Sequence, residues 1–162
     1  MLIDIYVLAS ERSNEIFDLF INSWMRGFIE VADEYEFPQY SEKPQAVYST
    51  YKKLVNKLMD APQEPHSIYW RAPNKDIVKG GMVFFTSDCA MIVGVSIDST
   101  DMKQISRYLK KIADTVGGSA GYCAFEEPPP ETVKEFLDAV MLSNYPKLID
   151  GQIVKDCIKK LW

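Results

Sequence analysis

The chain has 162 residues, of which 47% are hydrophobic and 25% are charged, so residues 1–162 are enough for one compact domain with its own core. This composition excludes a disordered chain and a collagen-like or low-complexity protein. Lys and Arg number 18 against 23 Asp and Glu, a formal net charge of −5. That sign argues against nucleic acid and anionic membrane as partners, because both attract a positive surface.

Residues that many catalytic and metal sites need are scarce. The chain has one histidine, His66, and three cysteines without a Cys-x-x-Cys pair, which excludes a multi-histidine metal centre. No phosphate-binding or dinucleotide-binding glycine motif is present, so we expect no cofactor. The cysteine pattern, the missing secretory signal and the short apolar runs predict a cytoplasmic protein with reduced thiols and no membrane span.

The first half of the chain predicts one strand followed by two helices. Apolar and polar residues alternate from Leu2 to Ala9, which is typical of a strand with one buried face. After the polar residues 10–13, large apolar side chains recur every three or four positions, which predicts a helix running to about Glu30. Pro44 suits the first turn of a second helix that ends before Pro62.

The second half predicts three consecutive strands, a helix, a further strand and a further helix. Ser87-Asp88-Cys89 reads as the turn of a hairpin, and Thr132-x-x-Glu135 is a capping box that starts a helix. We expect strands over 67–71, 77–86, 90–97 and 121–125, helices over about 101–116 and 132–145, and a short helix over 153–162. This order predicts the α+β class: a mixed, largely antiparallel five-stranded sheet with helices mainly on one face, similar to the ferredoxin-like split βαβ arrangement.

One candidate for partner binding lies between Glu30 and Glu42, where carboxylates alternate with aromatic side chains. Such a surface attracts a basic partner over distance and then contacts it with rigid side chains. The alternative is a solvated loop whose aromatic residues enter the core. The candidate contact residues are Asp33, Glu34, Tyr35, Glu36 and Tyr40.

A second candidate is the pair Glu126 and Glu127, followed by three prolines. Adjacent carboxylates can bind a cation or act as acid and base. They also interact favourably with the positive end of the helix that follows, which is the simpler explanation. We include both residues among the expected partner contacts.

These features favour a non-catalytic protein that binds another protein. In size, charge and general character across the whole chain, the sequence resembles the immunity proteins that bacteria keep against polymorphic toxins. The resemblance implies a cognate toxin whose basic cleft is bound and occluded. Two alternatives stay open: a small enzyme using Glu126 or Glu127 with Arg71 and His66, and a ligand-sensing or oligomer-forming domain. The sequence leaves the oligomeric state undetermined.

Overall fold

A computed structural model describes residues 1–74 and 76–154. Most of the helix predicted over 153–162 therefore lies outside the described residues, and Ile153 and Val154 belong to a strand instead. The elements run in the order β1 (Leu2–Leu8), α1 (Asn14–Trp24), β2 (Ile29–Glu30), β3 (Tyr35–Phe37), β4 (Ala46–Tyr48), α2 (Tyr51–Asp60), β5 (His66–Arg71), β6 (Val78–Phe85), β7 (Met91–Asp98), α3 (Met102–Val116), β8 (Ala120–Ala124), α4 (Val133–Leu142), β9 (Lys147–Ile149) and β10 (Gln152–Val154).

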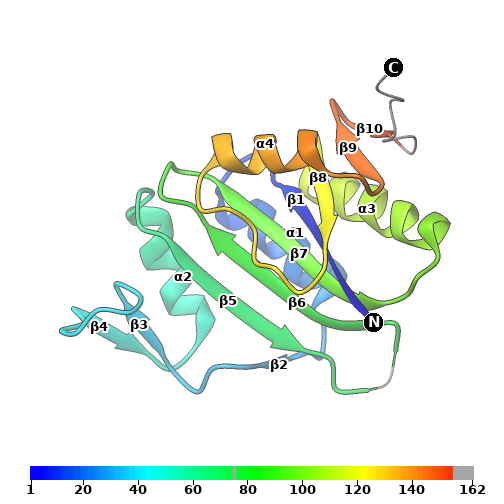
Figure 1. Cartoon of the computed structure of the whole chain (residues 1–162). Helices are drawn as coiled ribbons and strands as arrows, with labels where there is room; N and C mark the ends of the chain where they lie inside the picture. The colour runs from blue at the N-terminus through cyan, green and yellow to red at the C-terminus, as the bar shows by residue number, and fades with distance from the viewer. Residues whose placement is uncertain (75, 155–162) are drawn as a thin grey trace.

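The described strands form one large sheet and one small ribbon, which confirms the α+β class (Figure 1). The large sheet has eight strands in the order β10-β9-β8-β1-β7-β6-β5-β2, while β3 and β4 pair separately. Every pairing is antiparallel. The prediction of five strands in a mixed sheet was therefore wrong. The added strands have only two or three residues, too few to show a period in the sequence.

Both early helices are shorter than predicted. The first ends at Trp24 rather than Glu30. A turn follows in which the Phe28 amide donates to the Met25 carbonyl oxygen over 3.0 Å, and Gly27 adopts a φ of 77°, a conformation that suits glycine. The second begins at Tyr51 rather than Pro44, because Ala46–Tyr48 pairs with Tyr35–Phe37. Residues 46–48, expected to be helical, therefore form one strand of the ribbon beside the main sheet.

Helices cover the two faces of the large sheet unequally. Ile3, Ile5 and Val7 of β1 join the core beneath α1, α2 and α3, and in Figure 1 α1 lies on the far side of the sheet. Tyr6, between them, joins a smaller core on the near side, where α4 packs against β8 and β9. The prediction that this strand buries only one face was therefore wrong, because the side chains on both sides of β1 are buried.

Phe136 is the main anchor of α4. Its side chain is fully buried, and its ring packs edge-on against Tyr122 at 5.3 Å between centroids. We expect Phe136→Ala to lower the free energy of unfolding by about 3 to 5 kcal/mol in urea denaturation, because it leaves a cavity in the smaller core. The exposed neighbour Leu142 provides the control: Leu142→Ala should change it by less than about 0.5 kcal/mol. Equal effects of the two substitutions would contradict this packing.

Candidate protein-binding face

The acidic segment predicted between Glu30 and Glu42 divides its side chains between core and solvent. Asp33, Glu34 and Glu36 are exposed. Tyr35, predicted as a contact residue, is only 4% exposed, and its hydroxyl donates to Glu30 Oε1 over 2.9 Å. Because side chains alternate along β3, Tyr35 and Glu36 point to opposite sides of the strand. The buried Tyr35 side chain holds the segment in place, and the carboxylates face the solvent.

Tyr40 is the most exposed large side chain of this segment, at 86%. Its φ of 60° is a left-handed conformation that few residues other than glycine adopt. The preceding residue holds the segment against β5, because the Ser67 amide donates to Gln39 Oε1 over 2.9 Å. The Tyr40 ring is therefore exposed to solvent next to a residue that is hydrogen-bonded to β5.

His66 connects β5 to the same segment. The residue is 5% exposed, and its Nε2 lies 2.9 Å from the carbonyl oxygen of Glu36, to which it can donate. Burial lowers the pKa of the imidazole below its ordinary value, although the two backbone carbonyls next to it oppose the shift. This histidine thus positions the carboxylate-bearing strand.

Glu126 and Glu127 lie in the loop between β8 and α4, which crosses the near face of the sheet (Figure 1). The Tyr6 hydroxyl donates to the Glu127 carbonyl oxygen over 2.7 Å. At the far end of the loop, the Val133 amide donates to Asp88 Oδ2 over 2.9 Å. Both glutamate side chains remain exposed, on a loop fixed at each end.

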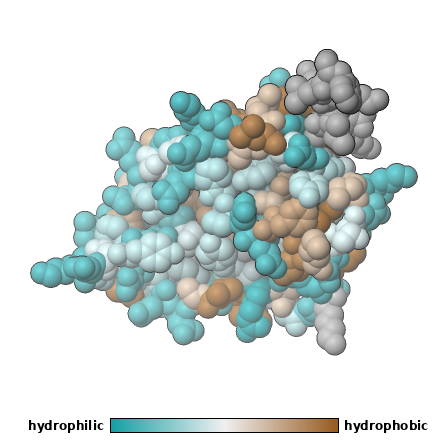
Figure 2. Space-filling model, in the orientation of Figure 1, coloured by the Kyte–Doolittle hydropathy of each residue, from teal (hydrophilic) through white to brown (hydrophobic). Residues whose placement is uncertain are grey.

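Between these two segments, none of the helices in residues 1–74 and 76–154 lies over part of the near face of β5 and β6 (Figure 1). We call this area the open face: Tyr69, Gly80 and Phe84, with residues 34–40 along one side and 126–131 along the other. Three hollows of about 310, 310 and 520 Å³ adjoin there, and Tyr69 lines all three. In Figure 2 most of the surface below α4 is pale, the intermediate hydropathy of tyrosine, glycine and proline.

The three hollows of the open face have an acidic lining. Among the described residues that line its three hollows, none is Lys or Arg. Arg71 lies at the edge of the open face, on the same side of β5 as Tyr69 and opposite Gly80, but lines none of them. Six carboxylates do: Asp4, Glu34, Glu36, Glu126, Glu127 and Glu131. Asp4 is buried and accepts a hydrogen bond from Ser96 Oγ, and burial raises the pKa of its carboxyl.

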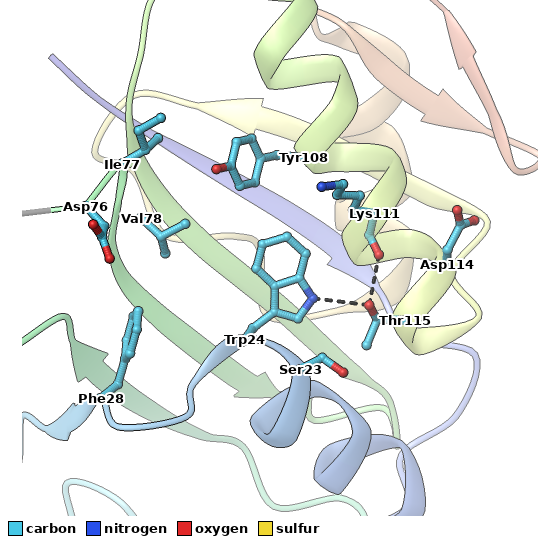
Figure 3. A pocket seen from close by; sticks show the side chains of 10 residues that line it. All are labelled: Ser23, Trp24, Phe28, Asp76, Ile77, Val78, Tyr108, Lys111, Asp114 and Thr115. Carbon is cyan, nitrogen blue, oxygen red and sulfur yellow. Dashed lines mark hydrogen bonds between the residues drawn. The ribbon is translucent and has the colours of Figure 1, made fainter.

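A larger hollow of about 770 Å³ lies elsewhere, between α1, α3 and the start of β6 (Figure 3). Trp24 and Tyr108 form its aromatic wall, and the Trp24 indole donates to Thr115 Oγ1 over 3.1 Å. Its charges are mixed, because Lys111, Asp76 and Asp114 all line it. Neither His66 nor Arg71 is among its lining residues.

The residues named for an enzymatic alternative do not converge. His66 and Arg71 occupy opposite ends of β5, about 17 Å apart at the usual rise of a strand. Five positions separate them, an odd number, so they project from opposite faces. Within residues 1–74 and 76–154, no group of three His, Cys, Asp or Glu side chains is arranged to hold a metal ion.

Comparison with known proteins gives one structural similarity and no sequence match. No family model matches it, and no curated protein matches it. Among solved structures it is similar to a chain in the complex of the toxic C-terminal tip of CdiA from Pseudomonas aeruginosa with immune protein: 14% identity over 77% of this chain and 86% of that chain, with a TM-score of 0.49. Likeness at that level carries no argument about function. No helix in the described part of the chain is long and apolar enough to span a membrane.

Sequence reasoning missed the floor of the open face. Tyr69 lies between the buried Ile68 and Trp70. The alternation of side chains along a strand therefore predicts that Tyr69 points to the other side of β5. The sequence does not predict that this side of β5 stays uncovered, because that depends on where α4 packs.

The buried imidazole predicts a dependence of stability on pH. Because the pKa of His66 is lower in the folded chain than its ordinary value of 6.5, the unfolded chain binds the proton more readily. This contribution to stability is fully present above about pH 6.5 and is lost as the pH falls through the unfolded and then the folded pKa.

Urea unfolding at pH 7.5 and pH 5.5 measures this effect. The wild type should lose more stability between the two values than His66→Gln, which has no imidazole to protonate. Parallel losses in the two proteins would mean that the pKa of His66 does not change on folding.

Proposed function

We propose that this chain is a non-catalytic binding protein that holds a basic protein partner against the open face and occludes the partner's positively charged cleft, as an immunity protein holds a toxin. The supporting observation is the lining of that face, which combines six carboxylates with no Lys or Arg among its described residues. The proposed contacts are Asp33, Glu34, Glu36, Tyr40, Glu126 and Glu127, with Tyr35 as their internal support.

The placement of the charge suits rapid capture of such a partner. Carboxylates on both sides of one face add their fields and raise the rate of encounter with a basic surface. Within about 10 Å, the screening length at 0.1 M salt, they also select against acidic partners. Tyr40 then provides rigid contact area at small entropic cost.

A double charge reversal tests the proposal. In Glu34→Lys/Glu36→Lys both altered side chains are exposed, so thermal stability should be nearly unchanged. Association with the partner captured from the native host should be about tenfold slower at low salt and less dependent on salt concentration, because the steering field is reduced. Stopped-flow kinetics across a salt series measures both quantities.

Asp60→Lys/Asp138→Lys is the matched control. Both positions are exposed on α2 and α4, outside the three hollows. Each double variant raises the net charge of −5 by four, to −1. The control should change the association rate by no more than about twofold. Equal slowing by the two variants would attribute the effect to net charge alone and remove the open face from the interface.

A further inference from the structure

We infer that the open face receives an arginine side chain on a narrow projection of the partner, with the guanidinium over Tyr69 and between the two acidic segments. This inference rests on the proposed function and adds the chemistry of the contact. The occupant follows from the shape of the face, from its aromatic floor and from its charge.

The shape favours a projection rather than a flat surface. The open face lies between residues 34–40 and the loop at 126–131, each held by hydrogen bonds to the sheet. At the floor, Gly80 provides no side chain, and the hollow beside it measures about 520 Å³. A long side chain or the tip of a loop enters such a recess, whereas a flat partner would leave it empty.

The floor is a row of rings that already support each other. Tyr69 meets Phe84 edge-on at 5.6 Å between centroids, and Phe84 meets Tyr6 edge-on at 5.9 Å. Tyr69 is nevertheless 41% exposed, so its ring is both held in place and accessible. A held aromatic face costs little entropy to use and attracts a cation.

The charge selects arginine among the possible occupants. A guanidinium is planar, stacks on aromatic rings and donates in pairs to carboxylates, whereas the ammonium of lysine is a compact and strongly hydrated charge. Glu126 and Glu127 line the same hollow as Tyr69, and Glu34 lines the adjoining one. A second copy of this chain would place carboxylates against carboxylates, which disfavours self-association here.

Amide chemical shifts of the whole protein, titrated with acetyl-Gly-Arg-Gly-amide, test the inference without a known partner. We expect saturable shifts at Tyr69, Gly80 and Phe84, with a dissociation constant on the order of millimolar for so small a ligand. The citrulline peptide has the same shape without the charge and should give no saturable shift there. The lysine peptide should bind about threefold more weakly.

Substitutions at Tyr69 distinguish a specific contact with its ring from a general attraction between the cationic peptide and the acidic protein. Tyr69→Ala should weaken binding of the arginine peptide about fivefold, while Tyr69→Phe keeps the ring and should stay within about twofold of the wild type. Tyr108→Ala, in the hollow of Figure 3, should leave binding unchanged.

Three results would overturn the inference: no saturable shifts at the open face, equal binding of the lysine or citrulline peptide, or shifts centred on the hollow of Figure 3. None of these results would contradict the proposed function. That function is tested by the association kinetics of Glu34→Lys/Glu36→Lys. Slow association of that variant together with no arginine binding would mean that the partner docks here by another contact.

Discussion

The width of the sheet and the length of one helix together decide which surface of this protein stays free. Eight strands at about 4.8 Å spacing make a sheet about 34 Å wide. Among the described elements, the helix on the near face is α4, whose ten residues span about 15 Å and pack on β8 and β9. The loop at 126–131 extends this cover, and β5 with part of β6 remains open.

An uncovered sheet face needs a composition that water tolerates, and here that composition also carries a negative charge. Tyrosine, glycine and proline give it intermediate hydropathy, while carboxylates gather on its two sides. None of the described residues that line its hollows is Lys or Arg. Arg71 lies at its edge, and Lys52 and Lys111 line hollows outside it. The segregation matters because mixed charges would cancel the field that attracts a basic protein.

Long periodic segments were predictable, and short ones were not. The strand at 2–9 and the helix ending at Val116, where Gly117 adopts a φ of 63°, follow from residue periods and capping chemistry. The ribbon of β3 and β4 does not. Its strands have three residues each, and they are stabilised by contacts distant in sequence, such as the one between His66 and Glu36.

The sequence by itself determined the class of fold, the net negative charge and the two acidic segments, because these depend on composition and local spacing. Only the tertiary structure decided that residues 33–40 and 126–127 lie on the two sides of one face. It also decided that Tyr35 is buried while Tyr69 and Phe84 form the floor. The reason is physical: chain neighbours fix the period of a strand, but the packing of distant helices decides which of its two sides meets water.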